Sequence, residues 1–176
     1  MHMSYRRFAA MIAASTVVML GLMYLNTYAL EHVRFSETRS YMALMMGAAM
    51  AVIMLGFMLG MYKKRAVNIA IFAGAAAVFA GSLWLVRSQA TIKETAYMKA
   101  MIPHHSIAVM TSERAAIRDP RVRRLADEII EAQLREIGEM ERLITELERN
   151  PPPADAPRLP SYRDRGAPSA SHSAPN

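Results

Sequence analysis

The hydrophobic positions of this 176-residue chain follow two patterns that meet near residue 87. Before that point, three apolar runs occupy residues 8–25, 41–62 and 67–86, and none of them contains Asp, Glu, Lys, Arg or His. A helix needs about 20 apolar residues to cross the hydrocarbon core of a bilayer. The first pattern therefore predicts a membrane domain, residues 1–87, with three transmembrane helices.

Basic residues between these runs predict their orientation. Arg6 and Arg7 precede the first run, and Lys63, Lys64 and Arg65 separate the second from the third. Short loops rich in Lys and Arg stay in the cytoplasm, which places the N-terminus inside and the C-terminal part outside. The outer loop, residues 26–40, also carries two Arg and is the weakest point of this assignment.

The first run has a second interpretation, as a cleaved signal peptide. Its start is basic, and Thr27, Tyr28 and Ala29 resemble a cleavage site. Its apolar part is long for a signal peptide, which favours an uncleaved anchor. Under either interpretation, the C-terminal part of the chain is exported.

Beyond residue 87 the apolar positions repeat with the period of a helix. Residues 88–118 predict one helix, interrupted or kinked at Pro103, which lacks a backbone N–H. Asp119 as N-cap and Pro120 as first residue then start a second helix that runs to about residue 149. Its apolar stripe has a near-heptad spacing: Val122, Ala126, Ile129, Gln133, Ile137, Met140, Ile144 and Leu147.

The predicted fold is therefore all-α: three transmembrane helices followed by an antiparallel helical hairpin, residues 88–150. Two helices cannot enclose a core by themselves. We expect homo-oligomerisation to complete a four-helix bundle, with docking on another partner as the alternative. The tail, residues 151–176, is rich in Pro, Ser and Ala and is predicted to be disordered.

Composition narrows the function. The formal net charge of +6 comes from basic residues that flank the apolar runs, so it reflects membrane topology, and no nucleic-acid partner is expected. The absence of Cys excludes disulfides, zinc thiolate sites and thiol catalysis. Catalytic motifs are missing from the sequence, so we expect no enzyme and no catalytic residues.

Candidate metal chemistry centres on His104 and His105. Met98 and Met101 lie upstream and Met110 lies downstream, and thioethers with imidazoles are the ligands that cuprous copper prefers. Residues three, four and seven apart share a helix face, so Met98, Met101 and His105 line one stripe. The alternative is ordinary packing, because a Met in a core is usually a flexible filler.

The second predicted helix repeats the three-four spacing with Gln133, Glu136 and Met140. Gln133 is a polar residue in an apolar stripe and needs a partner when buried, for which a histidine of the first helix is the expected candidate.

Two further patterns lie in the apolar runs. The second run carries Met at nearly every fourth position, either as a path for soft cations or, as we favour, as apolar filler: Met42, Met46, Met50, Met54, Met58 and Met61. Small residues that allow close helix approach mark the second and third runs, for packing within the chain or for self-association: Gly56, Gly60, Ala73, Ala77 and Gly81.

Residues 97–110, with the core Met-Ile-Pro-His-His, resemble the hallmark of the domain-of-unknown-function family 305. Residues 119–140, which contain the Asp-Pro start and the downstream Gln and Met, also resemble this family. Members are ferritin-like helical proteins, exported or membrane-anchored in bacteria, and some are periplasmic copper binders. The resemblance implies metal ligands at Met98, Met101, His104, His105, Met110 and Met140, with Gln133 and Glu136 in support.

This chain departs from the family pattern in two respects: many members have an acidic residue early in the first helix where Thr95 or a nearby position stands here, and soluble members often have two hairpins where this chain has one. The resulting expectation is a multi-pass protein of the bacterial inner membrane whose periplasmic hairpin binds copper, preferably Cu⁺ with Cu²⁺ as the second form. It would act as a buffer or chaperone in copper homeostasis or tolerance. The rival expectation is a metal-free helical module that docks a periplasmic or membrane partner.

Overall fold

The computed structural model describes residues 4–162 and 164–165, and in this part of the chain all regular secondary structure is helical, without a strand. The all-α prediction is confirmed. The elements are α1 (Tyr5–Leu22), the short 3-10 helix η1 (Leu30–His32), α2 (Glu37–Phe57), α3 (Arg65–Ser88), α4 (Glu94–Arg114) and α5 (Pro120–Arg149). Part of the tail predicted to be disordered, residues 163 and 166–176, lies outside the described residues.

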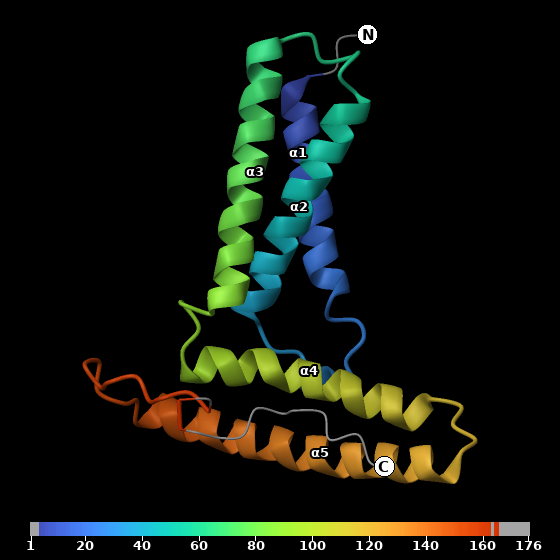
Figure 1. The fold of residues 1–176 in the computed structure, drawn as a ribbon, viewed down its shortest axis with the longest axis vertical. Helices are drawn as coiled ribbons and strands as arrows, with labels where there is room; N and C mark the ends of the chain where they lie inside the picture. Colours follow the sequence, from blue (N-terminus) through green and yellow to red (C-terminus); the bar gives the residue numbers. More distant parts are fainter. Residues whose placement is uncertain (1–3, 163, 166–176) are drawn as a thin grey trace.

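Helices α1, α2 and α3 form an upright bundle (Figure 1). Each of the three is long and apolar enough to cross a membrane. They begin a few residues before the predicted apolar runs, and polar side chains cap the first turns of α1 and α2. The Ser4 hydroxyl accepts from the Arg6 N–H, and the Ser36 hydroxyl accepts from the Arg39 N–H, so the helices start inside polar sequence.

The core of this bundle is small. Leu55 of α2 is fully buried and packs with Phe8 of α1 and Ala75 of α3. The outward surface stays apolar, with Val17 70% and Phe57 90% exposed. A surface of this kind suits contact with lipid chains better than contact with water.

Close approach between helices occurs at Gly47, where α2 meets α1. A Cβ at position 47 would collide with the hydroxyl of Thr16, so only glycine fits without a shift. A Cβ at Gly56, Gly60 or Gly81 would meet nothing within 4 Å. The small residues singled out in the sequence therefore do not pack this bundle, although their prediction for self-association stays open.

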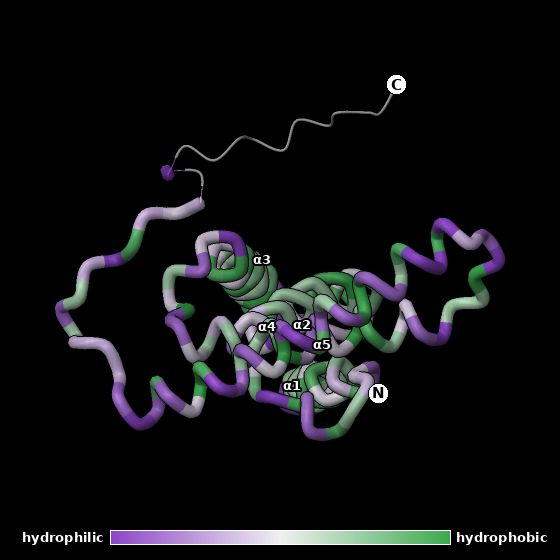
Figure 2. Tube along the Cα trace, turned by 90° about the horizontal axis from the view of Figure 1, so that it is seen from below, coloured by the Kyte–Doolittle hydropathy of each residue, from purple (hydrophilic) through white to green (hydrophobic). Residues whose placement is uncertain are grey.

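Helices α4 and α5 lie antiparallel across one end of the bundle, with α4 nearer to it (Figure 1). Seen along the bundle, the hairpin extends sideways beyond α1–α3 and mixes hydrophilic with hydrophobic residues (Figure 2). The change of direction follows Gln89, the C-cap of α3, which adopts a left-handed conformation with φ of 51°. A left-handed residue is a common way to end a helix.

The hairpin has a core of its own, concentrated at the end away from the α4–α5 turn. Buried Met98 and Ile102 of α4 meet Ile137 and Ile144 of α5, and Met140, Leu143 and Leu147 pack against them. Nearer the turn, the same α5 stripe is less covered: Val122 is 49% exposed and Ile129 is 36% exposed. The predicted stripe is thus buried over only part of its length.

The first helix of the hairpin is shorter than the predicted 88–118, because residues 89–93 form the turn out of α3 and Ala115 is already extended. Pro103 does not interrupt it: α4 runs through Pro103 as one helix, and the proline is buried. Loss of one backbone hydrogen bond is tolerated where tertiary packing holds the helix on both sides.

Replacing Gly47 by Leu is expected to destabilise the bundle by about 1–3 kcal/mol, because the new side chain must displace Thr16 from the α1–α2 contact. Thermal unfolding of the full chain in detergent measures this. Gly56→Leu is the matched control, since position 56 lies on the same helix beside open space. Equal melting temperatures for the two variants would contradict the close approach.

Candidate metal site and its junction with the membrane helices

His105 is the more enclosed of the two predicted histidine ligands. Its Nδ1 lies 3.1 Å from Oε2 of Glu136 on α5, and its side chain is 13% exposed. The approach lacks the alignment of a hydrogen bond, so within the described residues the buried Nδ1 has no hydrogen-bond partner. Burial lowers the pKa of His105, the carboxylate of Glu136 opposes this, and His104 adds to it. The ring is therefore neutral at pH 7, the form that binds metals.

His104 lies beside His105 but faces another way. The two ring centroids are 6.2 Å apart with the planes at 62°, and His104 is exposed. Adjacent residues of an α-helix point about 100° apart, so the two imidazoles cannot share one direction. Over the part of the chain that the structure describes, no three His, Asp or Glu side chains are grouped to hold a metal ion.

The methionines divide into two groups. Met98 is 6% exposed and Met140 packs in the same apolar cluster, so these two are brought together. Met101 is half-buried one turn before His105 on the same face of α4. Met110 follows His105 by five residues, which turns it about 140° around the helix axis.

Glu136 of α5, and not Gln133, lies opposite a histidine of α4. No hydrogen bond joins the half-buried Gln133 side chain to a histidine among the described residues, and Glu136 takes the place opposite His105. A half-buried amide still reaches water, which removes the need for a protein partner.

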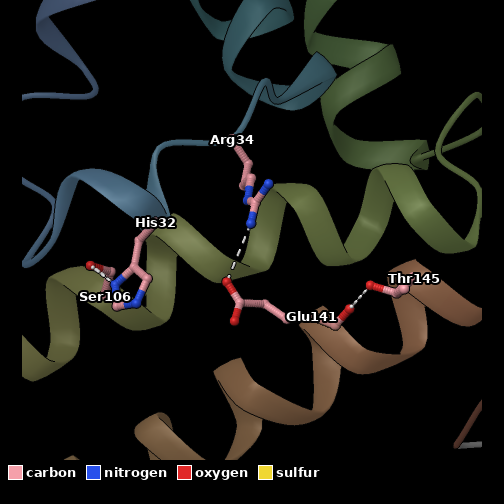
Figure 3. Close-up of polar contacts among 5 residues, drawn as sticks. All are labelled: His32, Arg34, Ser106, Glu141 and Thr145. Carbon is pink, nitrogen blue, oxygen red and sulfur yellow. Dashed lines mark hydrogen bonds and ion pairs between the residues drawn. The ribbon is translucent and has the colours of Figure 1, made fainter.

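A second polar site, at Ser106, was not predicted. Ser106 follows the histidine pair directly and is fully buried. Its Oγ accepts the N–H of Tyr28 at 2.7 Å and lies 2.9 Å from Nδ1 of His32 (Figure 3). The Ser106 hydroxyl donates to Nδ1 of His32 or accepts from it, according to the tautomer of the ring. The loop between α1 and α2 is thereby joined to α4.

The same loop reaches α5. Arg34 extends past α4 to Glu141, with 3.4 Å between the guanidinium and carboxylate, and both side chains are substantially exposed (Figure 3). The hydroxyl of Thr145 donates to the backbone carbonyl of Glu141 one turn along the helix. An exposed ion pair adds little stability, but this one gives the loop a contact on each helix of the hairpin.

The part of the chain that matches a known family contains these hairpin residues. Residues 94–175 match the family described as "Domain of unknown function (DUF305)". This segment belongs to the DUF305 family. It begins at the first residue of α4, so both histidines and the methionines of the hairpin lie within the DUF305 match and the three apolar helices precede it.

A relative of the chain is an uncharacterised protein of Acanthamoeba polyphaga mimivirus, 41% identical over 66 residues. The alignment covers 36% of this chain and 43% of the viral protein, so the chain spans less than half of that relative. No solved structure matches the chain.

Ser106→Ala is expected to release the loop, because the Tyr28 N–H and the buried His32 ring both lose their partner, at a cost of about 1–3 kcal/mol. Hydrogen exchange at the Tyr28 amide should become faster while the amides of α5 keep their protection. Ser112→Ala is the control, since no hydrogen bond of the Ser112 hydroxyl occurs within the described chain. Unchanged exchange at Tyr28 in Ser106→Ala would rule out the junction.

Proposed function

We propose that this protein is a membrane-anchored copper-binding protein whose DUF305 hairpin holds Cu⁺ as a buffer or chaperone in copper homeostasis. One observation carries the proposal: the His105 side chain is largely buried, and its Nδ1 has no hydrogen bond among the described residues although Glu136 lies nearby. An unpaired buried nitrogen is unusual in proteins, and a bound metal ion would supply the partner that it lacks. Cuprous copper is the ion whose preferences fit imidazole with thioether.

The residues around His105 support this chemistry. Met101 lies one turn before it, on the same face of α4, and Met98 continues that face into the core beside Met140. Glu136 sits across from the ring and would orient it. His104 and Met110 point to other sides of α4, so they would bind the ion only together with a second copy of the hairpin, which is the proposed reason for homo-oligomerisation.

The proposed topology places this site outside the cytoplasm of a bacterium. The α2–α3 turn with Lys63 and Lys64 lies at the same end of the bundle as the start of α1, because the Tyr5 hydroxyl donates to Oδ1 of Asn68 at 2.8 Å and accepts from the Lys64 N–H. Both basic clusters therefore mark one side of the membrane, and the hairpin lies at the opposite end (Figure 1). Basic loops favour the cytoplasm, so the hairpin would face the periplasm.

Copper is expected to raise the melting temperature of the full chain under reducing conditions, because a ligand of the folded state stabilises it. His105→Ala should abolish that increase, and Met101→Leu should reduce it at nearly unchanged core volume. Met61→Leu is the matched control, since Met61 lies in the α2–α3 turn, outside the hairpin.

A rival function is metal-free docking of a partner, favoured by the packing of Met98 and Met140 in an apolar cluster. In that case copper leaves the melting temperature of the wild type unchanged, and the double variant of His104 and His105 to Ala only lowers it. Loss of the copper effect in Met110→Leu as well would instead indicate a site shared between two chains.

Copper affinity should stay constant from pH 7.5 to about 6.5 and fall at lower pH, because protons compete for the neutral imidazole. The pKa of His105 is lowered by burial, so the loss should be centred below the usual histidine value. Competition titrations with a Cu⁺ chelator at several pH values measure this. Affinity that is independent of pH down to 5 would contradict histidine ligation.

A further inference from the structure

We infer that the turn end of the hairpin is a contact surface for the headgroups of anionic phospholipids. We call residues 114–125 the tip. The inference rests on the bilayer placement in the proposed function, and it does not depend on copper. It is carried by the charge, the exposure and the position of the tip.

Charge separates the tip from the rest of α5. The tip holds five Arg and one Asp: Arg114, Arg118, Arg121, Arg123, Arg124 and Asp119. Residues 127–149 hold eight acidic and three basic side chains. The hairpin is therefore strongly polarised along its length, and an anionic surface attracts the tip while it repels the remainder.

Three of the five tip arginines have no acidic partner among the described residues. Arg121 pairs with Asp119 and Arg123 pairs with Asp127, each at 2.8 Å. Arg114, Arg118 and Arg124 form no ion pair with any residue that the structure describes, and all three are exposed. Phosphate is a strong acceptor for the guanidinium group, which donates from several N–H groups at once.

Exposed apolar side chains accompany these arginines. Val122 is 49% exposed and Leu125 is 56% exposed on the first turns of α5. Of the described residues at this end of the hairpin only Val109 and Ala126 are buried, and the larger apolar cluster around Met98 and Ile144 lies at the other end. Arginines with interspersed apolar residues are typical of segments that lie in a membrane interface.

The placement of the hairpin brings the tip to the side of the membrane helices. It lies across the end of the bundle, and the tip projects sideways beyond the outline of α1–α3 (Figures 1 and 2). With the three helices in a bilayer, the region beside that outline is lipid. Each arginine near an anionic surface strengthens attachment roughly fivefold, so loss of three weakens it on the order of 100-fold.

The test uses the full chain in nanodiscs of phosphatidylcholine alone or with phosphatidylglycerol added. Because the sequence has no Cys, Val122→Cys carries a single nitroxide label. We expect phosphatidylglycerol to reduce the access of an aqueous paramagnetic reagent to this label. High salt should restore access, because it screens exposed charges.

The triple variant Arg114→Gln, Arg118→Gln and Arg124→Gln should lose the effect of phosphatidylglycerol. The triple variant Arg135→Gln, Arg142→Gln and Arg149→Gln removes the same charge from the acidic part of α5 and should keep it. Equal access in the two lipid mixtures, or equal loss in the two variants, would overturn the inference.

A second label, at Val78→Cys on α3, tests the bilayer placement separately from the tip contact, since Val78 is 45% exposed on an apolar helix. If this label is in lipid while the tip label ignores lipid composition, the tip contact fails and the bilayer placement stands. If the Val78 label is in water, both fail. Spin–spin broadening of the tip label in both mixtures would instead show a contact between copies of the chain and would also overturn the inference.

Discussion

The buried hydroxyl of Ser106 is the constraint on which the arrangement of this molecule depends. The three-helix bundle and the hairpin have separate apolar cores, around Leu55 and around Ile102. Between them lies a polar junction, in which Ser106 Oγ meets the Tyr28 N–H and the His32 ring. A buried hydroxyl without partners costs more than the hydrogen bonds contribute, so the loop and α4 must meet at this point and in this orientation.

The same contact determines the rotation of α4 about its own axis. With Ser106 directed at the loop, the helical period directs His105 toward α5 and leaves His104 to the outside. The difference between an enclosed and an exposed imidazole therefore arises from the residue that follows them, and not from the histidines. Any metal chemistry of the hairpin inherits its geometry from this junction.

Local patterns in the sequence predict most of the fold. The uncharged apolar runs predict α1, α2 and α3, and Asp119 with Pro120 marks the start of α5 because a side-chain cap and a fixed φ act within one turn. The limits of α4 were predicted less well: residues on both sides of it have ordinary helix propensity, and the residues at the two bends, Gln89 and Ala115, are neither Gly nor Pro. The contacts of Ser106 join residues 74 and 78 positions apart, and a single serine has no periodicity that reveals such a partner. The candidate ligands were found because helical spacing places Met101 and His105 on one face, whereas the choice of Glu136 over Gln133 depends on how α5 packs.

The junction also has a consequence for the order in which the protein assembles. The loop with Tyr28 and His32 precedes α4 in the chain, so a growing polypeptide has already made both partners of Ser106 before that serine leaves the ribosome. The hairpin can then pack against the loop between α1 and α2 as soon as it emerges. Its α4–α5 turn end is not held by this junction and can still change its orientation.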